Sequence, residues 1–133
     1  MKGTLAPGLA TTRAFTVDDS RIIGFMGQEG RVYSTPSLLA DIETTCRDML
    51  LEHLDKGEDS VGTRVELDHM AATPLGFEVK ISARVAKVDG RAVTLEVTAH
   101  DGIDEIGRCH HGRFVVDVAR TLDRLAAKAA KRR

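Results

Sequence analysis

The chain has 133 residues, of which 42% are hydrophobic and 29% charged, and its 19 Lys/Arg and 20 Asp/Glu leave a net charge of −1. This length and composition predict one compact domain, residues 1–133, with its own apolar core. Nucleic-acid-binding surfaces are basic or stack bases on aromatic rings. With a balanced charge, no Trp and one Tyr, the chain is not expected to have nucleic acid as a partner.

Two cysteines, Cys46 and Cys109, are too few and too far apart for a disulfide framework or a zinc motif. The first ten residues lack the charged start and long apolar run of a signal peptide. No apolar stretch approaches the roughly 18 residues that a membrane-spanning helix needs. These features predict a cytoplasmic protein that does not enter a membrane.

The N-terminal third predicts short strands. Residues 11–17 contain β-favouring side chains and are followed by a turn at residues 18–20. Residues 21–26 are a second candidate strand, and the glycines at both ends of residues 27–30 indicate a flexible loop.

Residues 36–54 predict one long helix. Ser34 or Thr35 can cap it, and Pro36 suits its first turn. At 100° per residue, one arc of the helix is apolar and the opposite arc is polar. The apolar arc holds Leu38, Leu39, Ile42, Cys46, Met49, Leu50 and Leu54, and the polar arc holds Asp41, Thr44, Thr45, Asp48 and Glu52.

After the helix the hydrophobic period changes to two, which predicts strands at residues 61–69, 77–85, 93–99 and 105–118. Asp89-Gly90 and Asp101-Gly102 are typical hairpin turns. An Ala-rich helix with a solvated basic end is expected at residues 121–133. A single long helix needs a sheet to cover its apolar arc. The pattern therefore predicts an α+β hot-dog fold, an antiparallel sheet wrapped around one central helix.

Two residues contradict the polarity of their positions. Glu43 falls inside the apolar arc of the helix, where a carboxylate loses hydration and suits general-base or nucleophile work. The alternative is a glutamate at the edge of the arc that reaches water or pairs with an arginine. His69 is in phase with the core residues Val65 and Leu67. It is either functional or a core histidine with a backbone partner.

Three further positions remain open on the pattern alone. Thr35 is a possible N-cap, but it precedes Glu43 by eight residues, close to two helical turns, so its hydroxyl can face the same side. Arg113 is in phase with Cys109 and His111 on the last strand, and is either solvated or an anion-binding group. No second ligand pair matches Cys109 and His111, so we expect no metal site.

Two segments of the sequence carry a recognisable pattern. One runs through Gly62-Thr63, His69, Ala71-Ala72-Thr73-Pro74 and Gly76, and the other covers residues 99–107. Both resemble hot-dog thioesterases of the fluoroacetyl-CoA thioesterase type. The resemblance extends from about Tyr33 to Val118 and includes the spacing of Thr35 and Glu43. It implies a catalytic set of Thr35, Glu43 and His69, with Gly62 and Arg113 binding the substrate near the thioester.

The resemblance also implies the activity, an acyl-CoA thioesterase acting as a homodimer whose sites lie near the interface between two edge-joined sheets. No cofactor is expected, since CoA is part of the substrate. The family's phenylalanine gate is replaced here by Glu29, which favours a broader acyl-CoA substrate than fluoroacetyl-CoA. The alternatives are a non-catalytic acyl-CoA-binding module and another hot-dog enzyme, such as an enoyl-CoA hydratase.

Overall fold

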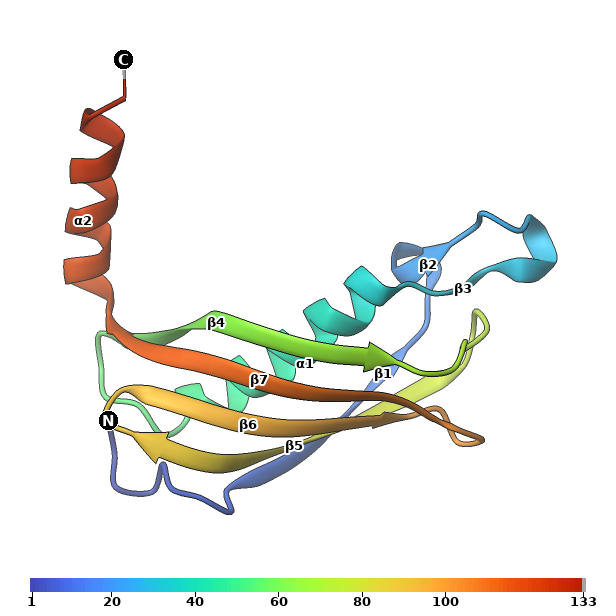
Figure 1. Cartoon of the computed structure of the whole chain (residues 1–133), viewed down its shortest axis with the longest axis horizontal. Coiled ribbons are helices and arrows are strands. Elements are labelled where there is room, and N and C mark those ends of the chain that lie inside the picture. Colours follow the sequence, from blue (N-terminus) through green and yellow to red (C-terminus); the bar gives the residue numbers. More distant parts are fainter. Residues whose placement is uncertain (133) are drawn as a thin grey trace.

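The computed structural model describes residues 1–132 and consists of an antiparallel sheet that curls around a long helix (Figure 1). Five strands form the sheet in the order β1-β5-β6-β7-β4. Their bounds are β1 Ala10–Thr16, β4 Glu58–His69, β5 Glu78–Asp89, β6 Ala92–His100 and β7 Glu105–Asp117. The short strands β2, Ile22–Ile23, and β3, Val32–Tyr33, pair with each other beside the sheet. The predicted α+β class and wrapped sheet are confirmed.

The N-terminal segments are more broken than the sequence predicts. The second strand is limited to β2, between the 3-10 turns Asp19–Arg21 and Gln28–Gly30. The expected loop at residues 27–30 is therefore largely a helical turn. Phe25 and Met26, which the strand prediction included, are 89% and 71% exposed.

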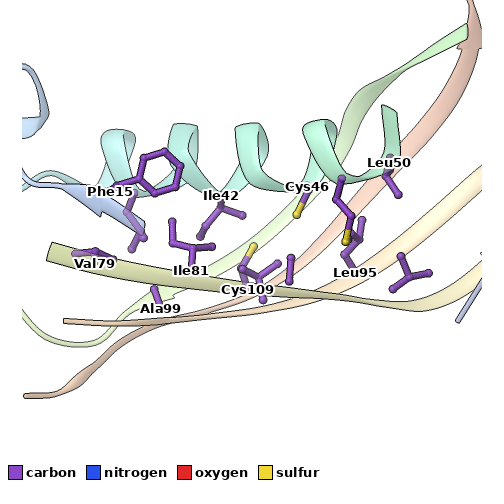
Figure 2. Packing of buried hydrophobic residues seen from close by; sticks show 14 of the residues in the cluster. Phe15, Ile42, Cys46, Leu50, Val79, Ile81, Leu95, Ala99 and Cys109 are labelled. Atoms are coloured by element: carbon purple, nitrogen blue, oxygen red, sulfur yellow. The ribbon is translucent and has the colours of Figure 1, made fainter. Parts of the chain in front are cut away.

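The central helix α1, Thr35–Leu51, directs its apolar side chains at the sheet (Figure 2). Ile42, Cys46 and Leu50 are fully buried against strand residues such as Ile81 and Leu95. Ser34 is the N-cap, because its hydroxyl oxygen accepts from the backbone N–H of Ser37 at 3.2 Å. Thr35 is therefore the first helical residue, and its hydroxyl is not used in capping.

The polar arc of α1 does not all face solvent, because its members Asp41 and Thr45 are buried. The Tyr33 hydroxyl donates to Asp41 Oδ2 at 2.5 Å, and Arg21 Nε donates to the same oxygen at 2.9 Å. Thr45 Oγ1 donates to the Asp41 carbonyl oxygen at 2.8 Å. The segment before α1 covers this face of the helix, and a helical wheel contains no information about such a neighbour.

A β-bulge interrupts strand β4. Gly62 pairs with Arg113 and Arg64 with Gly112, so Thr63 is an extra residue without its own partner. Before the bulge, Ser60 and Gly62 face the helix, and after it Leu67 and His69 do. The alternation read from the sequence is therefore correct only from Arg64 onward.

The C-terminal helix α2, Val118–Ala130, projects away from the sheet (Figure 1). It begins three residues before the predicted start, with Asp117 as its N-cap. The last residue of the predicted helix, Arg133, lies outside the described residues. Neither α1 nor α2 has the length and apolar character that a membrane crossing requires.

Candidate active site

The first candidate cluster joins the start of α1 to the end of β4. Thr35 Oγ1 and His69 Nδ1 form a hydrogen bond of 2.8 Å. His69 is held there because the next residue, Met70, donates its backbone N–H to the Ile106 carbonyl oxygen at 2.7 Å. Two residues that are 34 positions apart in sequence are thus brought together, as the resemblance implies.

The imidazole of His69 is only partly solvated. Its Nε2 atom is buried and has no hydrogen-bond partner within residues 1–132. Burial lowers the pKa of His69 below its ordinary value of 6.5, so the ring is neutral near pH 7. A neutral ring with one unsatisfied nitrogen can accept or deliver a proton at that atom.

A cavity of about 250 Å³ opens beside this pair. Its polar residues are Thr35, His69 and Tyr33, and the rest of its lining is aliphatic: Ile23, Val32, Met70, Ala71 and Ala72. An apolar lining with a few polar groups is typical of a site for a small ligand. A larger hollow of about 760 Å³ lies on the opposite face of the sheet, and none of the candidate catalytic residues lines it.

The second cluster surrounds Glu43, in the middle of α1. Arg113 Nη1 lies 3.3 Å from Glu43 Oε2, and the Arg113 side chain is 4% exposed whereas that of Glu43 is 42% exposed. Glu43 is thus at the edge of the apolar arc with an arginine partner, as the structural alternative in the sequence analysis described. A half-exposed carboxylate beside a buried cation stays accessible to a bound molecule.

Two residues that the sequence analysis did not select hold Arg113 in place. Arg113 Nε donates to Ser60 Oγ and Nη2 donates to the Ser60 carbonyl oxygen, each at 2.8 Å. Arg113 Nη1 also lies 3.1 Å from His111 Nε2. Because arginine only donates, Nε2 is the acceptor, and Nδ1 of His111 donates to the Arg64 carbonyl oxygen at 2.8 Å. His111 therefore has a structural role, which its phase with Arg113 could have suggested.

Gly62 lies directly against the carboxylate of Glu43. A Cβ atom at this position would be 2.6 Å from Glu43 Oε2 and 3.3 Å from Cε1 of His111. The close approach requires glycine, since any side chain would displace the Glu43 carboxylate. The residue expected near the thioester thus lies in the Glu43 cluster.

Gly62→Ala is expected to lower hydrolytic activity while leaving the free energy of unfolding within about 1 kcal/mol of the parent value. The new methyl group displaces the flexible end of Glu43, which can move toward solvent, and leaves the core intact. Thiol release and urea denaturation measure the two quantities. The control is Gly112→Ala on strand β7. The Cβ atom that this substitution adds would lie 3.2 Å from Thr63 Oγ1. A fully active Gly62→Ala variant would contradict the role of this contact.

The two clusters are separate within one copy of the chain. Thr35 and Glu43 are eight residues apart in α1, which is roughly 12 Å along a helix axis. Among residues 1–132, no hydrogen bond joins Glu43 to Thr35 or to His69. The five residues selected from the sequence therefore form one pair, Thr35 and His69, and one group of three, Glu43, Gly62 and Arg113.

The two sequence segments that carry the resemblance meet in a scaffold next to His69. Thr73 Oγ1 donates to Asp101 Oδ2 at 2.9 Å, and Asp101 Oδ1 accepts from the backbone N–H groups of Ile103 and Asp104. Although burial opposes it, these donors hold the pKa of Asp101 below its usual value. The Tyr33 N–H also donates to the Thr73 carbonyl oxygen at 2.8 Å. Thr73 and Asp101 thus position the loop behind the Thr35–His69 pair.

Acidification is expected to destabilise the protein. Burial lowers the pKa of both His69 and His111 below 6.5, so below about pH 6.5 the unfolded chain binds more protons than the folded one. The stability contributed by the neutral rings is complete above that pH and is lost as the pH falls through it. Urea denaturation at about pH 7.5 and about pH 5.5 measures the loss. The loss of stability between the two pH values should be smaller in His111→Asn than in the control His110→Asn, which alters the exposed neighbouring histidine. Equal losses in the two variants would contradict a contribution of His111 to the pH dependence.

The comparisons with known proteins agree with this architecture. A family model described as fluoroacetyl-CoA-specific thioesterase matches residues 17–119. The fluoroacetyl-CoA thioesterase of Streptantibioticus cattleyicolor is 32% identical over 123 residues, which cover 87% of this chain and 88% of that protein.

Solved structures give the same result. A structure of a fluoroacetyl-CoA thioesterase is 29% identical, with a TM-score of 0.83 and coverage of 97% of this chain and 98% of that one. A hot-dog-like protein from Thermanaerovibrio acidaminovorans, 24% identical with coverage of 92% and 91%, supports the fold with a TM-score of 0.85. The chain therefore belongs to the fluoroacetyl-CoA-specific thioesterase family of hot-dog thioester hydrolases.

Proposed function

We propose that this chain hydrolyses the thioester of a small or medium acyl-CoA, with Thr35, Glu43 and His69 as its catalytic residues. Membership of the thioesterase family supports the reaction class. The observation that carries the residue assignment is the Thr35–His69 hydrogen bond beside an apolar cavity. Glu43, held by Arg113 and facing Gly62, supplies the carboxylate.

In the proposed reaction, Glu43 either deprotonates the attacking water or attacks the thioester carbonyl carbon itself. The carbon–sulfur bond then breaks, and the CoA thiolate takes up a proton that His69 shuttles from water. If Glu43 is the nucleophile, the acyl group is left on Glu43 as an anhydride, and water then attacks this anhydride to release the free acid and restore the carboxylate. Thr35 orients the acyl carbonyl or the carboxylate with its hydroxyl group. Backbone N–H groups at the start of α1 or at Gly62 donate to the oxygen that becomes negative. The products are the free acid and CoA, and no cofactor beyond the substrate's own CoA is required.

We further propose that two copies assemble the complete site. Strand β4 lies at the edge of the sheet, and its outer side has no partner strand within residues 1–132. It also exposes Val61 and Val65, which are 44% and 40% accessible. A long edge strand presents unpaired backbone N–H and C=O groups to another strand, so the β4 strands of two copies are expected to pair antiparallel.

This arrangement accounts for the separation of the two clusters. With the two-fold axis beside Val65 and Glu66, Gly62 of one copy would lie opposite the partner's His69. Glu43 and Arg113 of one copy would then face the Thr35–His69 pair of the other. Each of the two sites in the dimer would draw its carboxylate from one copy and its imidazole from the other.

The acyl group is proposed to occupy the cavity of about 250 Å³ at Thr35 and His69. The position expected to hold the family's gate is Glu29, in the exposed segment between β2 and β3. A carboxylate there does not close an apolar lid over a small fluorinated acyl group. We therefore propose a substrate range broader than fluoroacetyl-CoA.

The test is thiol release from a panel of acyl-CoAs that includes acetyl-, fluoroacetyl-, butyryl- and hexanoyl-CoA. We expect turnover of several members and a loss of turnover in Glu43→Ala. Binding of acyl-CoA without turnover of any member would overturn the proposal and identify a non-catalytic acyl-CoA-binding module. Turnover of fluoroacetyl-CoA alone would overturn the proposed breadth of substrates.

A further inference from the structure

Helix α2 presents an apolar arc that no other part of residues 1–132 covers. None of the residues Val118–Ala130 is buried, and Leu122 and Leu125 are 59% and 56% exposed. At 100° per residue, Leu122 and Leu125 lie on one side together with Val118, Ala126 and Ala129. The other side carries Arg120, Arg124, Lys128 and Lys131. The separation of the two arcs is typical of a helix that packs against a surface.

The apolar arc faces away from the body of its own copy. Arg120 and Arg124 line a groove of about 340 Å³ together with Phe114 and Val116 of β7. The basic arc is thus the side of α2 that lies toward the sheet. Leu122 and Leu125 are on the opposite side of the wheel, so the chain's own sheet cannot bury them.

A helix of this length is marginal by itself. Isolated helices shorter than about 12–15 residues are barely stable in water, and tertiary packing of the apolar face supplies most of the stability of a protein helix. The 13 residues of α2 have a capping residue but no such packing. A surface outside the described copy is therefore required to cover the arc.

Charge indicates what that surface is. Residues 118–133 contain six Lys/Arg and one Asp/Glu, a net charge of +5, whereas residues 1–117 contain 13 and 19, a net charge of −6. A basic arm and an acidic body attract each other across two copies of the chain. Two bodies that pair without their arms would instead repel each other.

The position of α2 also indicates a second copy. It follows Asp117, which pairs with Glu58 at the beginning of β4, and it extends past the open edge of that strand (Figure 1). Exposed apolar residues continue from the arm onto this edge, namely Val118, Phe114 and Val61. A copy that pairs through β4 would meet the arm of the first copy.

We propose that α2 is an exchanged arm, which packs its apolar arc of Val118, Leu122 and Leu125 onto the body of a second copy in the dimer. The inference rests on the β4-paired dimer of the proposed function and adds a second contact to it. The two arms related by the dimer axis tie the copies together on both sides of the shared strands. The acidic body of each copy receives the basic arm of the other.

The experiment compares Leu122→Glu/Leu125→Glu with Ala127→Glu, which places the same carboxylate outside the apolar arc. Sedimentation velocity over a dilution series gives the dimer dissociation constant of each full-length variant. We expect the double variant to raise this constant at least about tenfold and Ala127→Glu to leave it unchanged. Circular dichroism establishes that both variants are folded. In the wild type, hydrogen exchange of the α2 amides should be slow in the dimer and fast at protein concentrations below the dissociation constant, where the copies separate.

The remaining outcomes separate this inference from the proposed function. An unchanged dissociation constant in the double variant, with fast exchange of α2 in the wild-type dimer, would overturn the arm exchange alone. A second test uses vesicles of equal parts phosphatidylserine and phosphatidylcholine. If the wild type sediments with these vesicles and the double variant does not, while the dimer dissociation constant is unchanged, the arc is a lipid contact and the arm exchange is overturned. A wild type that is monomeric throughout would overturn both the arm and the paired site. A dimer that depends on the arm but releases no thiol would support the arm and overturn only the catalysis.

Discussion

His69→Ala is expected to reduce kcat for thioester hydrolysis by about two to four orders of magnitude, the usual range for loss of a positioned acid–base group. The imidazole is neutral near pH 7, bonded to Thr35 through Nδ1, and unsatisfied at Nε2 within residues 1–132. Alanine removes the proposed proton carrier and leaves Thr35 without its partner. Thiol release under saturating acyl-CoA measures kcat, and urea denaturation excludes unfolding as the cause.

Thr35 and a second histidine provide the controls. Thr35→Val should lose activity in the same direction because it removes the hydroxyl, whereas Thr35→Ser keeps that hydroxyl and most of the activity. His53 forms a similar hydrogen bond, 2.7 Å from its Nδ1 to Thr4 Oγ1, outside both candidate clusters. His53→Ala should therefore retain wild-type kcat. Near-normal turnover in His69→Ala would rule out His69 as the proton carrier.

Arg113→Met is expected to lower the free energy of unfolding by about 3 kcal/mol or more, because three buried acceptors lose their donor at a cost of about 1–3 kcal/mol each. The guanidinium is 4% exposed and satisfies Ser60 Oγ, the Ser60 carbonyl oxygen and His111 Nε2. Methionine fills much of the volume but leaves these buried acceptors unpaired. Urea denaturation at pH 7.5 gives the difference between variant and parent.

The contrast with neighbouring substitutions makes this prediction specific. Glu43→Gln should cost at most about 1 kcal/mol, because Glu43 is 42% exposed and solvent screens its pairing, yet it should abolish most of the turnover. Arg108→Met removes an exposed arginine of the same strand, paired with Glu105 at 2.7 Å, and should change stability by less than about 1 kcal/mol. Equal costs for Arg113→Met and Arg108→Met would show that the buried network contributes nothing specific.

The main elements could be predicted because their hydrophobic periods are local. Leu38, Ile42 and Cys46 mark one face of α1 at helical spacing, and Val79, Ile81 and Ala83 mark one face of β5 at a spacing of two. The C-terminal helix was expected three residues too late, because Val118 also fits the apolar alternation of the preceding strand. Boundaries of this kind depend on capping residues, here Asp117, and not on the period.

The candidate site could be predicted only in part. Glu43 and His69 stand out because each places a polar group on an apolar face, and that signal lies in the sequence itself. Ser60 and His111 give no such signal singly, since their role arises from Arg113, which is 53 residues from Ser60. The burial of Asp41 could not be predicted, because its partners, Tyr33 and Arg21, come from a segment whose path the helix pattern does not determine. Hydrophobic periodicity therefore predicts which face of an element is buried, but not which distant residues contact it.

The bulge at Thr63 has a consequence for how insertions and deletions act on this protein. A strand encodes its two faces by parity, so adding or removing one residue exchanges the faces of everything that follows until the next irregularity. Gly62 and His69 have opposite parity, yet both face the helix because one surplus residue lies between them. Deleting Thr63 would regularise the ladder and leave Gly62 and His69 both facing the helix, whereas deleting a residue between Arg64 and His69 with the bulge intact would place them on opposite faces. A chain that is one residue shorter between these two positions therefore keeps both residues facing the helix only when the missing residue is the bulge itself.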